Sequence, residues 1–126
     1  MRTAARILVD QLLVHGVDTA YCVPGESYIS VLDAIGGSPI RLYTTRHEAA
    51  AANMAEAYGK LTGRPGVCLV TRAPGATQAA VGIHTASQDS TPLVLFVGQV
   101  PRPHLGREAF QELDYTRMFG EIPYKE

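Results

Sequence analysis

The sequence contains no tryptophan, only two cysteines, no long apolar run and almost no net charge. Cys22 and Cys68 are too few for a disulfide framework, and we expect both to be buried free thiols. The longest apolar run covers residues 93–97, far below the ~20 residues of a membrane span. Asp10 and Gln11 interrupt the stretch that a secretory signal would need. With a formal net charge of −1, these absences predict a soluble cytoplasmic protein that binds neither nucleic acid nor membrane.

Several common catalytic and nucleotide-binding motifs are also missing. No Gly-Lys-Ser/Thr follows a glycine-rich loop and no G-x-G-x-x-G follows an apolar run, which argues against nucleotide binding by those routes. No G-x-S-x-G elbow is present for a serine nucleophile. The histidines form no H-x-x-x-H or mixed cysteine–histidine set, so we expect no metal site built by this chain.

The residues that are present alternate between helical and extended patterns. Apolar residues at helical spacing predict helices over residues 3–15, 27–35, 46–61 and from 76 onward, with a weak helical segment at 115–119. Apolar extended runs predict strands over residues 19–23, 40–43, 67–70 and 93–97. Ser27 is the expected N-cap of the short second helix. Because the central strands are apolar throughout, we predict one α/β domain of three layers, with a mainly parallel sheet and helices on both faces.

In such folds ligands bind beyond the carboxyl ends of the strands. Those ends carry Pro24-Gly25-Glu26, Thr45 to Glu48, Thr71 to Thr77 and Gly98-Gln99. Gly25 and Gly75 each follow a proline there. Each glycine either forms a plain turn or lets the backbone approach a ring or a phosphate. We therefore look for chemistry at this edge.

Glu48 is the most informative residue of the edge, and it has two interpretations. With Thr45 it matches the S/T-x-x-E capping box, in which the glutamate caps the start of the helix. It also heads a row of very small residues, Ala52, Ala55 and Gly59, which lets another backbone or a flat ligand approach closely. The solvated face of the same helix is expected to hold Asn53, Glu56 and Lys60, with the last two as an i,i+4 pair. A carboxylate at the head of an apolar wall is suited to exchange a proton with a ligand.

Seven runs of residues, in order, resemble a known family. They are Val23 to Glu26, Arg46 to Ala51, Pro65 to Thr71, Pro74 to Thr77, Asp89 to Leu93, Gly98 to Val100 and Ala109 to Glu112. Together they resemble the N-terminal, pyrimidine-binding domain of thiamine-diphosphate enzymes, in particular the acetolactate synthase-like group. On this basis, residues 1–120 are assigned to such a domain and residues 121–126 to a divergent tail or truncated linker.

The resemblance implies roles for individual residues. The glutamate that matches Glu48 hydrogen-bonds N1′ of the cofactor's aminopyrimidine and so prepares the ring to remove a proton from the thiazolium. The residues implied at the cofactor are Pro24, Gly25, Glu26, Thr71, Pro74, Gly75 and Gln78. Phe110 and Gln111 match positions at the substrate end of the pocket, where the resemblance implies a small 2-oxo acid such as pyruvate.

The sequence also departs from the family pattern. The family usually has Gly where Ala73 stands and Asn where Gln78 stands, so we expect Ala73 to strain the loop if φ there is positive. No Gly-Asp-Gly…Asn motif is present to hold Mg²⁺ and the diphosphate. The resemblance therefore implies a diphosphate-binding domain on a second subunit, in a homo- or hetero-oligomer, and no FAD on this domain.

Three interpretations of function follow. The chain is the pyrimidine-side half of a 2-oxo-acid carboligase or decarboxylase and inactive alone, or it is the small subunit of a split thiamine-diphosphate decarboxylase. Alternatively, it is a non-catalytic remnant that dimerises through the apolar faces of its alanine-rich helices.

Overall fold

Four short parallel strands form the sheet in the computed structural model of the chain, which describes residues 2–120 and 122. The strands are β1 (Thr19–Cys22), β2 (Arg41–Thr44), β3 (Gly66–Val70) and β4 (Leu93–Val97), in the spatial order β2-β1-β3-β4. Every pair is parallel, and Cys68 of β3 lies in register with Tyr21 of β1 and Leu95 of β4. The predicted parallel sheet is confirmed, and all four strands lie within two residues of their predicted bounds.

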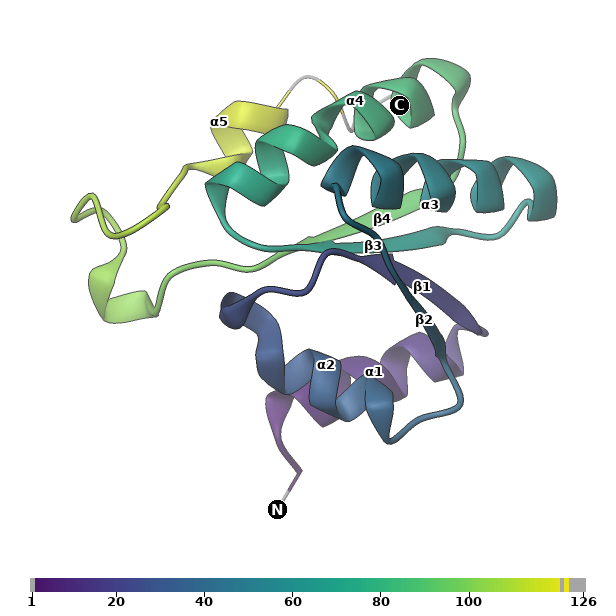
Figure 1. Ribbon diagram of the computed structural model, residues 1–126, viewed down its shortest axis with the longest axis horizontal. Helices are drawn as coiled ribbons and strands as arrows, with labels where there is room; N and C mark the ends of the chain where they lie inside the picture. The colour runs from purple at the N-terminus through teal and green to yellow at the C-terminus, as the bar shows by residue number, and fades with distance from the viewer. Residues whose placement is uncertain (1, 121, 123–126) are drawn as a thin grey trace.

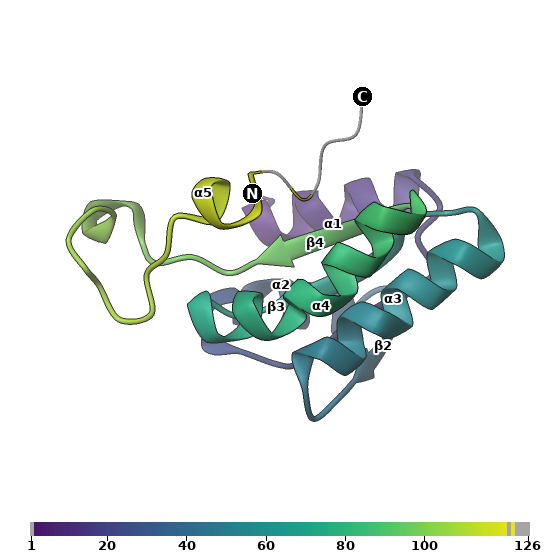
Figure 2. The same cartoon turned by 90° about the horizontal axis from the view of Figure 1, so that it is seen from above.

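Helices cover both faces of the sheet, as Figures 1 and 2 show. One face carries α1 (Ala4–Val14) and α2 (Ile29–Gly36), and the other carries α3 (Glu48–Thr62) and α4 (Ala73–Asp89). Short helical segments complete the described elements: 3₁₀ turns at Glu26–Tyr28 and Arg102–His104, and α5 at Tyr115–Phe119. The three-layer α/β architecture is confirmed.

Two apolar clusters hold the layers together. Val9, Ile35, Val67 and Leu69 fill the space between the sheet and the helices α1 and α2, and each is nearly or fully buried. On the other face, α3 and α4 pack through very small residues such as Ala51, Ala52, Ala55 and Ala79, none of which is exposed. Burial of this apolar surface supplies the main favourable term in folding.

Backbone segments from other parts of the chain pack closely against the row of small residues on α3. A Cβ atom added to Gly82 of α4 would lie 2.6 Å from the Cβ of Ala52, and one added to Gly59 would lie 2.3 Å from the carbonyl oxygen of Pro92. Gly66, at the start of β3, lies so close to Ala55 that its Cβ would overlap the Ala55 carbonyl. Close approach of a second backbone therefore explains this row.

Two expectations about these helices were wrong. Ser27 does not cap α2, which begins after Tyr28 without a side-chain cap, and its hydroxyl bonds to the hydroxyl of Thr71 (2.8 Å) instead. Glu56 is not on a solvated face: the residue is only 8% exposed. The segment that leads into β4 packs over it, and the Thr91 hydroxyl donates to its carboxylate (3.3 Å). The predicted pair with Lys60 is present at 2.9 Å.

The predicted tail at residues 121–126 lies outside the described residues except for Ile122. The proposed boundary at residue 120 therefore stays a prediction. Within residues 2–120 and 122, no helix has the length and apolar character needed to cross a membrane.

Candidate functional site

The loops that follow β1 and β3 meet at the carboxyl edge of the sheet. A Cβ on Gly25 would lie 2.5 Å from the Cβ of Thr71, so the first loop passes directly against the second. Ser27 lies against Gly98, the residue after β4, whose added Cβ would fall 1.9 Å from the Ser27 hydroxyl oxygen. Three strand ends are thus brought together, as predicted for a ligand-binding edge.

Glu48 is the first residue of α3, and the predicted capping box is absent. His47 is the N-cap, and its Nδ1 accepts a hydrogen bond from the backbone N–H of Ala49 at 3.1 Å. The Thr45 hydroxyl donates to the carbonyl of His47 at 2.9 Å. Because His47 performs the capping, the Glu48 side chain is not required to cap its own helix.

Glu48 is a buried residue whose carboxylate has no protein partner. The residue is 8% exposed, and among the described residues its side chain makes no hydrogen bond or ion pair. A Cβ on Gly75, in the first turn of α4, would lie 3.5 Å from Glu48 Oε1. The carboxylate oxygens are not fully enclosed by protein, so they are available as acceptors for a ligand that supplies an N–H.

The surroundings of Glu48 are poorly solvated. The pKa of Cys68 is raised to about 12, mainly by burial. Charge interactions with Cys22 and then with Glu48 make smaller contributions in the same direction. The pKa of Tyr28 is raised as well, mainly by burial, with smaller contributions from Cys22, Cys68 and Glu48. Both cysteines are buried free thiols, as predicted. At neutral pH, these neighbours are neutral groups that do not compensate the charge of Glu48.

Tyr28 is a site residue that sequence reasoning missed. Its hydroxyl donates to the carbonyl of Val23, at the end of β1, and lies 3.2 Å from the carbonyl of Leu69 in β3. It also lies under Gly25, whose added Cβ would be 3.3 Å from the tyrosine ring. A tyrosine four residues after Pro24 carries no motif, so no sequence signal identified it.

The first turn of α4 supplies a second wall. Pro74 is exposed and Gly75 is buried, and Gly75 packs against Thr71 and Val70. Ala73 begins the helix and does not have a positive φ. The condition for strain at Ala73, a positive φ, is therefore not met. Gln78 lies on an exposed position of the same helix.

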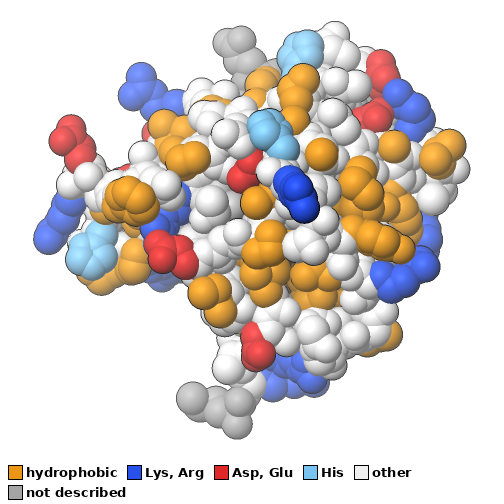
Figure 3. Space-filling view, in the orientation of Figure 1, with side chains coloured by type: hydrophobic (Ala, Val, Ile, Leu, Met, Phe, Trp, Pro, Cys, Tyr) orange, Lys and Arg blue, Asp and Glu red, His pale blue; other side chains and the backbone are white. Residues whose placement is uncertain are grey.

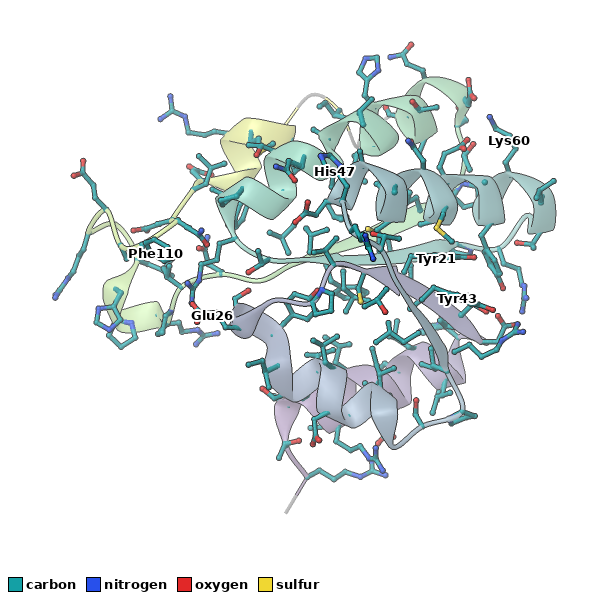
Figure 4. The ribbon with its side chains drawn as sticks, viewed as in Figure 1. Tyr21, Glu26, Tyr43, His47, Lys60 and Phe110 are labelled. Atoms are coloured by element: carbon teal, nitrogen blue, oxygen red, sulfur yellow. The ribbon has the colours of Figure 1, made fainter. Side chains whose placement is uncertain are left out.

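Phe110, labelled in Figure 4, and Gln111 lie on a loop beyond the carboxyl edge, on the side where the surface in Figure 3 protrudes. Gln111 has φ of 62°, and its carbonyl accepts the N–H of Ala73 at 3.1 Å, which ties the loop to the start of α4. The carboxylate of Glu112 accepts two backbone N–H groups of the loop. Phe110 is 73% exposed, and Figure 4 shows it at the same end of the molecule as Glu26. The structure therefore brings Gln111 to the site through its backbone and leaves the Phe110 ring in solvent.

A separate apolar groove lies away from these residues. It has a volume of about 550 Å³ and runs between α1 and β4, with Leu8, Val94 and Phe96 among its lining residues. Gly16, Thr19 and Pro65, at or before the amino ends of β1 and β3, also line it. It is therefore at the opposite edge of the sheet from Glu48 and does not belong to the candidate site.

Comparison with known proteins gives a consistent family match. The family model described as "Thiamine pyrophosphate enzyme, N-terminal TPP binding domain" matches residues 2–118. The chain is 43% identical over 116 residues to an acetolactate synthase large subunit of Parasynechococcus marenigrum (strain WH8102), covering 89% of this chain and 19% of the relative. It is 44% identical over 116 residues to an acetolactate synthase of Arthrospira platensis, covering 89% and 20%.

A mitochondrial acetolactate synthase of Schizosaccharomyces pombe is 44% identical over 114 residues, covering 90% of this chain and 17% of the relative. The chain thus spans about a fifth of the length of the curated relatives that it matches.

Proposed function

This chain belongs to the family of thiamine pyrophosphate enzyme N-terminal domains, and we propose that its Glu48 binds the aminopyrimidine ring of that cofactor. The chain is homologous to the catalytic subunits of acetolactate synthases. The single observation that carries the proposal is the unpartnered carboxylate of Glu48: the residue is only 8% exposed, and its carboxylate makes no hydrogen bond among the described residues. A protonated ring nitrogen would supply the missing donor and form a charge-assisted hydrogen bond.

The residues around Glu48 fit a flat ring. Gly75 faces the Glu48 carboxylate, and a Cβ on Gly75 would already lie 3.5 Å from Oε1. Gly25 approaches Thr71 so closely that any side chain at residue 25 would collide with it. Two glycines and a short threonine therefore leave backbone and small groups to face a ligand at this edge.

We assign roles to this chain's own residues on that basis. Glu48 accepts the hydrogen bond from the ring nitrogen and so holds a proton at N1′. Thr71, Pro74 and Gly75 form one wall of the pyrimidine site, and Pro24, Gly25 and Glu26 form the facing loop. When bound, thiamine diphosphate supplies an electron sink for the decarboxylation of a 2-oxo acid. Gln78, farther along α4, remains a proposed contact on the resemblance alone.

The substrate, the metal ion and the site for the diphosphate complete the proposed reaction. The matched relatives are acetolactate synthases, so we propose pyruvate or a similar 2-oxo acid as the substrate. Phe110 and Gln111 are proposed to lie at the end of the pocket where this substrate binds. Mg²⁺ and the diphosphate are assigned to a diphosphate-binding domain of a second subunit in an oligomer. Among the described residues, no three or more His, Cys, Asp or Glu side chains lie together in a way that could hold a metal ion. FAD is not assigned to this domain, and a cytoplasmic location stays a prediction because some relatives are mitochondrial or chloroplastic.

A graft tests the proposal directly. Residues 2–118 replace the matching segment of the Arthrospira platensis relative, and thiamine diphosphate binding is measured by calorimetry beside pyruvate turnover. We expect the graft to bind the cofactor and the Glu48→Gln graft to lose most turnover while remaining folded. The matched control is Glu56→Gln, because Glu56 is equally buried on the same helix but is paired with Lys60. Equal turnover of the Glu48→Gln and parent grafts would contradict the role of Glu48.

A further inference from the structure

An ion pair joins the two loops that flank the site. Arg72 Nη1 donates to Glu26 Oε1 at 2.8 Å. The two side chains differ in burial: that of Arg72 is 14% exposed and that of Glu26 is 69% exposed. The pair therefore consists of a cation held by the protein and an anion that lies largely in solvent.

The guanidinium of Arg72 has donor capacity that Glu26 does not use. Only Nη1 is bonded, and Nη2 has no hydrogen-bond partner among residues 2–120 and 122. Nε also lacks a partner but is fully buried, so a ligand reaches the guanidinium through its two Nη atoms. An arginine presents its donors as a planar fork that matches both oxygens of a carboxylate. Glu26 contacts the fork through one nitrogen, so the present pairing is incomplete.

The backbone of Arg72 lies beside the proposed reaction site. Arg72 is the N-cap of α4, and Gly75, which faces Glu48, lies three residues farther along. The N–H of Ala73, the next residue, donates to the carbonyl of Gln111. Arg72 thus belongs to the turn that joins the proposed pyrimidine wall to the proposed substrate loop, and its guanidinium reaches the facing loop at Glu26.

We propose that Arg72 recognises the carboxylate of the 2-oxo-acid substrate and that Glu26 is its counter-ion when no substrate is bound. This inference rests on the proposed function for the identity of the substrate. Glu48 and Glu26 are both acidic, so an anionic substrate needs a nearby cation to offset their repulsion. Glu26 is largely exposed, so its carboxylate can move into solvent when a competing carboxylate takes its place on Arg72. The incoming carboxylate gives Arg72 the second acceptor that its fork lacks.

The test uses the chain as it is and needs no cofactor. The arginine Nε–H signals of the ¹⁵N-labelled chain are followed by NMR during titration with pyruvate. We expect the Arg72 signal to shift with pyruvate and not with neutral methyl pyruvate. Glu26→Gln frees the guanidinium and should tighten pyruvate binding by about two- to fivefold, as expected for loss of a competing exposed ion pair.

Variants at position 72 complete the test. Arg72→Met should abolish the pyruvate response, and Arg72→Lys, which keeps the charge but not the fork, should weaken it. Arg46→Met is the matched control, since Arg46 is an exposed cation at the same edge, and it should leave binding unchanged. If Arg72→Met fails to fold, the change in pyruvate affinity of Glu26→Gln alone tests the proposal.

Three results would overturn the proposal: unchanged or weaker pyruvate binding in Glu26→Gln, an Arg72 signal that pyruvate does not move, or inorganic phosphate binding as tightly as pyruvate. Because no cofactor is present, these outcomes are independent of the Glu48 graft experiment. If the graft failed to bind the cofactor, the assignment of a 2-oxo acid as substrate would be lost. The titration would still report whether Arg72 binds a carboxylate.

Discussion

Glu48 Oε1 and the α-carbon of Gly75 face each other with space for little more than one methyl group between them, since a Cβ on Gly75 would lie 3.5 Å from that oxygen. Glu48 begins α3, and Gly75 lies in the first turn of α4. The relationship therefore places a charged, buried oxygen where two helices begin beside each other, at the carboxyl edge of the sheet.

Replacement of Glu48 by Gln should not destabilise the chain. The carboxylate has no protein partner to lose, so its neutral isostere should leave the free energy of unfolding unchanged or raise it by up to about 1 kcal/mol. Glu56→Gln is the comparison, because it removes a paired carboxylate and should lower that free energy. Urea unfolding of both variants measures the difference. A Glu48→Gln variant less stable than wild type would show that the carboxylate has a structural partner.

Gly82→Ala should disrupt the contact between α3 and α4. Its new Cβ would lie 2.6 Å from the Cβ of Ala52 and 2.8 Å from the Ala52 carbonyl carbon. We expect a loss of about 1–3 kcal/mol in the free energy of unfolding, typical of overpacking. Gly36→Ala is the control, since nothing lies within 4 Å of its added Cβ and alanine favours helix. Similar stabilities of the two variants in denaturant titration would refute this close packing.

Asp18 should make the unfolding free energy depend on pH in acid. Hydrogen bonds from Thr19, Arg64 and Tyr58 lower the pKa of Asp18 from 3.8 to about 2. Its contribution is therefore present above pH 3.8 and lost as the pH falls through about 2. Asp18→Asn should flatten the decline in urea midpoint between about pH 4 and pH 2. Parallel declines in wild type and Asp18→Asn would contradict the assignment.

Cys68 should resist alkylation in the folded chain. Its pKa is raised from 9.0 to about 12, mainly by burial. At pH 9 the reactive thiolate is therefore scarce, and the buried sulfur is also inaccessible to the reagent. Stability due to the neutral thiol is complete below pH 9.0 and is lost as the pH rises toward about 12. Mass spectrometry after iodoacetamide treatment should show slow labelling of Cys68 and fast labelling of an exposed Ser30→Cys variant. Equal rates for the two thiols would disprove the burial.

The sequence predicts the framework well because apolar patterning is a local signal. The run from Leu93 to Val97 and the segment from Tyr115 to Phe119 form the predicted strand and helix with the predicted bounds. Interactions between distant segments were less predictable. Glu56 looked solvated because the segment that buries it lies far along the chain, at Thr91.

The site was predicted in part for the same reason. Glu48 was identified, but the cap on its helix was misassigned because Thr45 and His47 both offer acceptors and only the fold selects His47. The ion pair between Arg72 and Glu26 joins loops 46 residues apart, and no pattern in the sequence connects them. Tyr28, likewise, contributes through the carbonyl of Val23, just after β1, and that of Leu69 in β3.

An NMR titration of the ¹⁵N-labelled chain with thiamine diphosphate tests the central claim most directly. The account predicts shifts of the Glu48, Gly25 and Gly75 amide signals that saturate in wild type and weaken at least tenfold in Glu48→Gln, about 1.4 kcal/mol of lost binding. Glu56→Gln should behave like wild type. The same response in wild type and Glu48→Gln, or shifts confined to the groove around Leu8 and Phe96, would contradict the account.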